Sequence, residues 1–132
     1  MNLVDTSVWV AVLRDRSGAK QAAFRAAVAD APVALSRLTE YELLAGSRDQ
    51  AEWRLLASYL DDQLYVPFPD ESWRDAARIY FDLRRQGLTV SGPVDCAMAQ
   101  SALENDAVLV HRDRDFEIIA RVRPLRQRYL DL

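Results

Sequence analysis

The fold of this chain is decided at its start, where residues 2–9 read NLVDTSVW. Residues 2–4 form a short apolar run that predicts a buried strand. Asp5 and Thr6 follow directly, and both residue types are good N-caps for the helix predicted over residues 7–14. The chain therefore opens with a strand, a tight turn and a helix.

The alternation of short apolar runs with helical segments continues to the end of the chain. Further strands are predicted at residues 33–35, 64–66 and 107–110. Helices are predicted at residues 19–29, 38–45, 50–60, 70–86 and 92–103, and a last short helix opens at residues 113–115. Short apolar strands between helices indicate a parallel sheet covered on both faces. We therefore predict an α/β protein with three α/β/α layers around a short central parallel sheet.

Length and composition fit one globular domain that spans residues 1–132. Half of the residues are apolar and 28% are charged, which excludes collagen-like, low-complexity and fully disordered chains. Cys96 and His111 are the single cysteine and the single histidine, so neither an intramolecular disulfide nor a Cys/His zinc site can form. The N-terminus lacks the features of a signal peptide, and no apolar run reaches membrane-spanning length. We expect a cytoplasmic protein without a membrane segment.

Charge is unevenly spread along the chain. The protein carries 17 basic and 20 acidic residues, a net charge of −3, which argues against binding of nucleic acid by bulk charge alone. Residues 111–132 carry six arginines against four carboxylates, a net charge of +2, and the rest of the chain has a net charge of −5. The basic C-terminal stretch is either a solvated tail or a surface that contacts phosphate.

Carboxylates stand where the predicted strands end. Asp5 ends the first strand, and Asp113 and Asp115 follow the last one. Asp95 lies in the first turn of the helix that begins near residue 92. In open parallel sheets, reactive groups collect at the carboxyl ends of the strands, where loops and helix N-termini meet. We therefore expect these side chains to converge on one pocket.

Two glutamates lie on the helix predicted at residues 38–45. Glu40 and Glu42 are two residues apart, so they point roughly 200° away from each other around the helix. Only one of them can face the same pocket as the aspartates. A glutamate on a surface helix is usually solvated, so the helix alone does not assign a function to either residue.

Each aspartate also has a purely structural explanation. Asp5 and Asp113 can cap helices, and Asp95 can complement a helix dipole. If the carboxylates do converge, however, two unit charges about 4 Å apart repel by about 4 kcal/mol at an effective dielectric constant of about 20. Such a cluster needs a cation, and a site built from oxygen ligands alone suits Mg²⁺ or Mn²⁺.

Four stretches of sequence carry a resemblance to a known family. They are LVDTSVW at residues 3–9, TEYELLAG at 39–46, PVDCAMA at 93–99 and DRDF at 113–116. In this order they resemble PIN-domain ribonucleases, and most closely the VapC-type toxins of type II toxin–antitoxin pairs. The resemblance covers nearly the whole chain. It implies a PIN-like fold, a metal-dependent endoribonuclease acting on structured RNA, most often a tRNA, a cognate antitoxin as partner, and a homodimer.

The resemblance also implies the site residues. The family's catalytic acidic quartet corresponds to Asp5, Glu42, Asp95 and Asp113, with Asp115 as a variable fifth carboxylate. Asp5, Asp95 and Asp113 would hold Mg²⁺ or Mn²⁺, and Glu42 would orient or deprotonate the attacking water. Glu42 is assigned because the family has a glutamate directly before leucine and a few residues before glycine.

Neighbouring polar residues complete the expected site. Thr6 and Ser7 could supply a hydroxyl to the metal shell or to the substrate, although helix capping explains at least one of them equally well. Arg112 and Arg114 are candidate RNA phosphate contacts, or else pair with acidic surface groups. His111 departs from the family pattern, in which this position is more often small and polar.

The three tryptophans are assigned no role in RNA binding. Large aromatic residues are more often part of the core than exposed stacking platforms, so Trp9, Trp53 and Trp73 are expected to be buried. Trp9 adjoins the helix that carries the site and could line a groove for a partner instead.

Other functions compete with the nuclease interpretation. A receiver domain also gathers carboxylates around Mg²⁺, but it needs a lysine near the pocket, and the only lysine, Lys20, lies in the early helical region. A phosphatase of the haloacid dehalogenase type needs an aspartate two residues after Asp5, where Ser7 stands. The remaining alternative is a catalytically silent PIN-fold module that binds RNA or docks an antitoxin.

Overall fold

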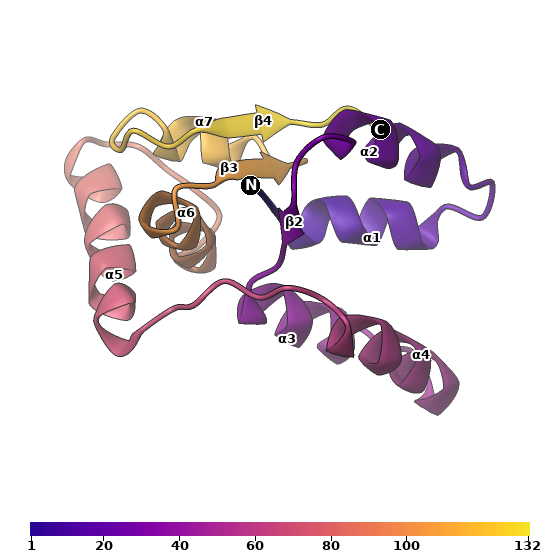
Figure 1. Ribbon diagram of the computed structural model, residues 1–132. Helices are drawn as coiled ribbons and strands as arrows, with labels where there is room; N and C mark the ends of the chain where they lie inside the picture. Colours follow the sequence, from indigo (N-terminus) through magenta and orange to yellow (C-terminus); the bar gives the residue numbers. More distant parts are fainter.

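A parallel sheet of four strands forms the centre of the protein. The structure is a computed structural model that describes residues 1–132 (Figure 1), and the strand order is β2-β1-β3-β4. The strands are β1 (Asn2–Val4), β2 (Val33–Ala34), β3 (Val108–His111) and β4 (Gln127–Tyr129). Leu3 is in register with Ala34 on one side and with Leu109 on the other. The opening strand of the sequence thus lies inside the sheet.

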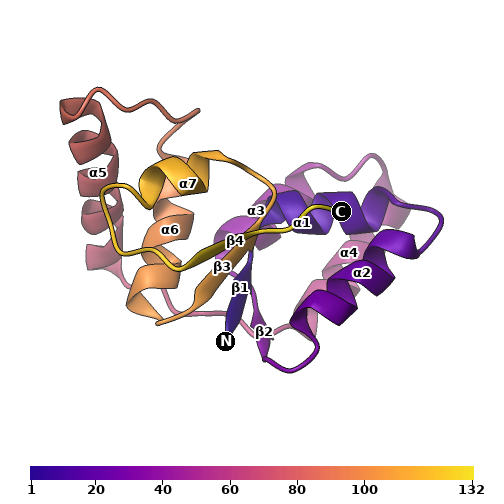
Figure 2. The same ribbon diagram turned by 90° about the horizontal axis from the view of Figure 1, so that it is seen from above.

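Seven helices cover the two faces of this sheet. They are α1 (Thr6–Arg14), α2 (Ala19–Val28), α3 (Arg37–Ala45), α4 (Gln50–Asp61), α5 (Asp70–Arg85), α6 (Val94–Glu104) and α7 (Asp115–Ile119). Helices α5, α6 and α7 lie on one side of the sheet, and α1 to α4 lie on the other (Figures 1 and 2). The structure confirms the predicted α/β fold with helices on both faces of a parallel sheet.

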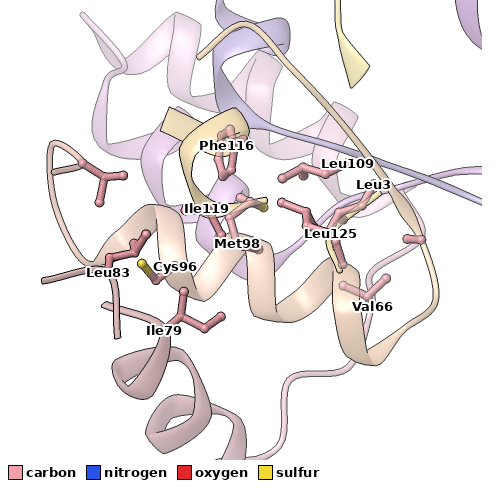
Figure 3. Close-up of a cluster of buried hydrophobic side chains, with 14 of the residues drawn as sticks. Leu3, Val66, Ile79, Leu83, Cys96, Met98, Leu109, Phe116, Ile119 and Leu125 are labelled. Carbon is pink, nitrogen blue, oxygen red and sulfur yellow. The ribbon is translucent and has the colours of Figure 1, made fainter. Parts of the chain in front are cut away.

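The strands alternate between two buried clusters, one on each face of the sheet. Leu3 and Leu109 pack with Phe116 and the other side chains under α5, α6 and α7 (Figure 3). Val4 and Val110 belong to the cluster on the opposite face, together with residues of α1 to α4. Successive side chains of a strand point to opposite faces, so even strands of three or four residues contribute to both clusters.

One predicted strand is absent from the sheet, and one strand of the sheet was not predicted. Residues 64–66 do not form a strand, because Tyr65 makes only an isolated bridge to Leu35 and Pro67 follows directly. The fourth strand is instead β4, within the stretch that we considered as a solvated tail. Its sequence, QRY, contains an exposed arginine and has no apolar run. Edge strands commonly carry charged residues, so an apolar pattern does not identify this one.

The prediction for the tryptophans holds for one of the three. Trp9 is buried on α1 and packs edge-on against Phe24, with 5.4 Å between the ring centroids. Trp53 and Trp73 remain 45% and 53% exposed, so the expectation that they belong to the core was wrong. None of the helices is long and apolar enough to cross a bilayer.

Candidate active site

The carboxyl ends of β1 and β3 bring acidic residues to one edge of the sheet. Asp5 follows β1 and caps α1, with its carboxylate accepting hydrogen bonds from the Ser7 amide (3.0 Å) and the Ser7 hydroxyl (2.5 Å). Asp113 follows β3 and precedes α7, and Asp95 lies in the first turn of α6. The structure therefore confirms that Asp5 caps α1, and the same side chain also lies at this edge of the sheet.

Three of the predicted residues form a compact acidic cluster. Carboxylate oxygens of Asp95, Asp113 and Asp115 all lie within 4.8 Å of one another. Asp113 accepts a hydrogen bond from the Asp115 amide (2.9 Å), and Asp115 accepts two from Ser91, one from its amide and one from its hydroxyl, both at 2.8 Å. Asp115 is thus a full member of the cluster and not only a variable accessory to it.

Electrostatics links Asp5 to this cluster. The pKa of Asp95 is raised to about 7, mainly by burial and then by the negative charges of Asp113, Asp5 and Asp115. Burial also raises the pKa of Asp5, although its hydrogen bonds with Ser7 oppose that rise. Carboxylates from β1, α6 and the β3–α7 turn therefore repel one another, as expected for a site that a divalent cation would neutralise.

Glu42 lies beside this edge but outside the three-carboxylate cluster. Its carboxylate accepts a hydrogen bond of 2.9 Å from the Thr6 hydroxyl at the start of α1. Glu40 points elsewhere, because it pairs with Arg37 at 3.0 Å and contacts the Tyr65 hydroxyl at 3.3 Å. Thr6 thus connects α3 to the turn that carries Asp5.

If the protein cleaves RNA, as the resemblance to PIN-domain ribonucleases implies, we expect Thr6→Val to lower the cleavage rate roughly tenfold. Valine keeps the shape of threonine but removes the hydroxyl that holds Glu42, and a hydrogen bond to a charged group is worth about 1.5–3 kcal/mol before solvent replaces part of it. The cleavage rates of Thr6→Val and Thr6→Ser, measured side by side, test this, because serine keeps the hydroxyl. Equal rates for Thr6→Val and the unsubstituted protein would show that Glu42 needs no such support.

His111 supports the turn that carries Asp113, a contact that the sequence did not reveal. The imidazole is fully buried, and its Nδ1 accepts a hydrogen bond of 3.1 Å from the Asp113 amide. Nε2 therefore carries the proton and donates to the Gln127 side-chain oxygen at 2.6 Å. Because Gln127 belongs to β4, the edge strand fixes the backbone next to the cluster.

The two candidate RNA contacts differ in what already engages them. Arg114 pairs with Glu117 at 2.6 Å and stacks on the Tyr129 ring, 3.7 Å from its centroid. Arg112 pairs with no Asp or Glu side chain, but one of its terminal nitrogens donates to the Leu132 main-chain oxygen at 3.3 Å, and its amide donates to the Ser7 hydroxyl at 2.9 Å. Of the two guanidinium groups, only that of Arg114 is paired with an acidic side chain.

A groove of about 560 Å³ runs from Glu42 between α1, α3 and α4. Its apolar lining includes Val10 on α1, Leu43 on α3 and Leu55 on α4, and Leu55 is 74% exposed. Arg14 and other charged side chains line the same groove. An apolar groove with charged sides that begins beside a catalytic candidate can receive a segment of another molecule.

The donor set fits a hard divalent cation. Asp95, Asp113 and Asp115 supply the oxygens of the cluster, with Asp5 close enough to affect the charge of Asp95. Mg²⁺ and Mn²⁺ prefer carboxylate oxygens and retain water ligands that a phosphate can displace. The buried imidazole of His111 already uses both of its nitrogens, so it is not available as a ligand.

Comparison with known proteins gives consistent results. Residues 3–122 match the family model described as "PIN domain". The chain is 33% identical over 125 residues to VapC ribonuclease Mb1587 of Mycobacterium bovis and to ribonuclease VapC11 of Mycobacterium tuberculosis, covering 92% of this chain and 93% of each relative.

Solved structures share the fold at lower sequence identity. The VapBC2 structure from Rickettsia felis, bound to a DNA fragment from its promoter, superposes with a TM-score of 0.77 at 17% identity and covers 98% of both chains. VapBC-1 from nontypeable Haemophilus influenzae gives a TM-score of 0.75 at 17% identity, covering 97% of this chain and 96% of its own. The matched family model and the identity over nearly the full chain show that this protein belongs to the PIN-domain family, in the branch of the VapC ribonucleases.

Proposed function

We propose that this protein is the toxin of a type II toxin–antitoxin pair and acts as an endoribonuclease that depends on Mg²⁺ or Mn²⁺. The observation that carries the proposal is the convergence of Asp95, Asp113 and Asp115, with the pKa of Asp95 raised to about 7. A metal-free cluster of this kind is electrostatically unfavourable, so its presence in a PIN-domain chain favours a cation-dependent function. The relatives named as ribonucleases support the choice of RNA as substrate.

Each acidic residue has a proposed part in the hydrolysis. Asp5, Asp95 and Asp113 would hold the cation directly or through water, and Asp115 lies where it can share that task. When bound, the cation stabilises negative charge on the scissile phosphate. Glu42, held by Thr6, orients or deprotonates the attacking water. The expected products carry a 5′-phosphate and a 3′-hydroxyl.

The proposed substrate is a structured RNA, with tRNA as the first candidate from the family resemblance. Arg112 is the first proposed phosphate contact, because it pairs with no Asp or Glu side chain, and Arg114 could join it after releasing Glu117. Ser7 holds Asp5 and the Arg112 amide at the same time, so its proposed part is structural.

The proposed partner is a cognate antitoxin. The structural relatives from Rickettsia felis and Haemophilus influenzae are VapBC assemblies, which supports a partner of this kind. The groove beside Glu42 has the apolar lining that a partner segment would need. We further propose that residues 1–132 act as one PIN-like domain, that the toxin forms a homodimer, and that it works in the cytoplasm.

The test of this proposal is cleavage of total cellular RNA by the purified protein. We expect cleavage in Mg²⁺ or Mn²⁺, its loss in excess chelator, and its return when the cation is restored. Sequencing RNA 5′-ends after induction in cells would then identify the substrate, because the products carry 5′-phosphates. RNA binding without any chelator-sensitive cleavage would favour the alternative, a catalytically silent PIN-fold module that binds RNA or docks an antitoxin.

A further inference from the structure

A second cavity lies on α1, next to the acidic cluster and apart from the carboxylates themselves. It has a volume of about 380 Å³, and its polar lining comprises Ser7, Arg14, Asp15, Lys20 and Arg112. These residues come from α1 and its C-cap, the start of α2 and the residue that follows β3, and β3 is far from the other two elements in the sequence. We call it the Arg112 cavity.

The Arg112 cavity has an excess of unpaired positive charge. Arg14, Lys20 and Arg112 line it, and none of the three forms an ion pair with an Asp or Glu side chain. Asp15 is the one acidic lining residue, and its carboxylate already accepts hydrogen bonds from the Ser17 hydroxyl (2.8 Å) and the Lys20 amide (2.9 Å). Three cations against one anion make the cavity attractive to a negatively charged ligand.

Arg112 has a donor that nothing in the protein satisfies. Its Nε atom is buried without a hydrogen-bond partner, although one terminal nitrogen donates to the Leu132 carbonyl at 3.3 Å. A buried, unsatisfied donor is costly, so the protein alone does not fully satisfy this guanidinium. The planar guanidinium suits a phosphate, whose oxygens can accept two hydrogen bonds at once.

The cavity is connected to the catalytic edge through short contacts. The Arg112 amide donates to the Ser7 hydroxyl, and the same hydroxyl donates to the Asp5 carboxylate. Arg112 also directly precedes Asp113 in the chain. Through Ser7 and Arg112, the cavity therefore adjoins the segments that carry Asp5 and Asp113.

We propose that the Arg112 cavity binds a backbone phosphate of the RNA substrate next to the scissile one, with Arg14, Lys20 and Arg112 as its cationic contacts. This inference rests on the proposed nuclease function. It favours RNA over an acidic protein segment because the cavity adjoins the place where the scissile phosphate must lie. It also adds Arg14 and Lys20, which the sequence did not mark, to the candidate RNA contacts.

The test measures the binding of a short, single-stranded, fluorescent RNA of randomised sequence by anisotropy over a series of KCl concentrations. An Asp95→Asn background prevents cleavage during the measurement and leaves the cavity unchanged. We expect Arg14→Ala and Lys20→Ala each to weaken binding roughly two- to fivefold. Each should also reduce the slope of log affinity against log salt by about 0.7, with additive effects in the double variant. Arg85→Ala is the matched control, because Arg85 is an exposed, unpaired arginine on α5.

The outcomes separate this inference from the nuclease function. If Arg14→Ala and Lys20→Ala bind RNA like Arg85→Ala while the unsubstituted protein cleaves RNA, the cavity proposal is wrong and the nuclease proposal stands. If those variants bind RNA normally but lose affinity for polyglutamate, the cavity is a docking site for an acidic protein segment and our inference is also wrong. If the unsubstituted protein neither binds nor cleaves RNA, the proposed function fails and this inference fails with it.

Discussion

Asp95→Asn is expected to lower cation-dependent RNA cleavage by about a thousandfold or more. The asparagine side chain would keep the size of the aspartate but lose the negative charge that contributes to holding the cation in the acidic cluster. Cation stabilisation of the phosphate is worth several kcal/mol, and each 1.36 kcal/mol changes a rate about tenfold. Single-turnover cleavage of total RNA in saturating Mn²⁺ measures this loss directly.

The same substitution is expected to stabilise the protein when no divalent cation is present. Ionising Asp95 costs free energy, because burial disfavours its charged form and because Asp113, Asp5 and Asp115 repel the negative charge. Removing its charge should raise the free energy of unfolding by about 1–2 kcal/mol, after discounting the pKa shift for solvent screening at this partly exposed side chain. The melting temperature in chelator should therefore rise by a few degrees.

The opposite signs of these two effects distinguish a functional cluster from a structural one. Asp75→Asn on α5 is the matched control, because Asp75 is exposed and has no hydrogen-bond partner or ion pair in the protein. That variant should change neither the cleavage rate nor the melting temperature. Undiminished cleavage by Asp95→Asn, or a lower melting temperature in chelator, would contradict the assignment of Asp95 to the cation site.

The fold could be predicted because its signals are local. Residues 2–4 are an apolar strand followed by capping residues, and β1 has those bounds in the structure. The missed strand β4 pairs only along the edge of the sheet, so its residues need no apolar run. Residues 64–66 have the composition of a strand but meet the sheet at one bridge, because prolines follow at 67 and 69. The composition of a segment alone does not show which strands it will pair with.

Part of the site could be predicted from the predicted sheet. Asp5 and Asp113 follow strands, and the sheet itself dictates that strand ends meet at one edge. The features that the sequence missed depend on tertiary structure: Gln127 hydrogen-bonds His111 from the edge strand, and Lys20 and Arg112 line the same cavity. The members of these pairs are 16 and 92 residues apart in the chain, and their spacing follows no periodicity that a sequence could display.

The pH dependence of stability should reveal the cluster without any activity measurement. The folded-state pKa of Asp95, about 7, lies above its ordinary value of 3.8, so between these values the folded protein binds more protons than the unfolded chain. The free energy of unfolding in chelator should therefore fall as pH rises from about 4 to about 7, by about 1–2 kcal/mol from this group after the same discount for solvent. Melting temperatures measured in chelator at several pH values between these limits test the sign.

A divalent cation should reverse this trend, because it binds the ionised carboxylates and competes with their protons. The rise in melting temperature on adding Mn²⁺ is therefore expected to be small near pH 5 and several degrees near pH 8. Asp95→Asn isolates the contribution of the cluster, because other carboxyls, such as Asp82 beside Arg123, have lowered pKa values and change stability in the opposite direction at lower pH. A rise in melting temperature on adding Mn²⁺ that is the same at both pH values, or equally large in Asp95→Asn, would show that the cation binds elsewhere. Either result would contradict the proposal that the acidic cluster holds it.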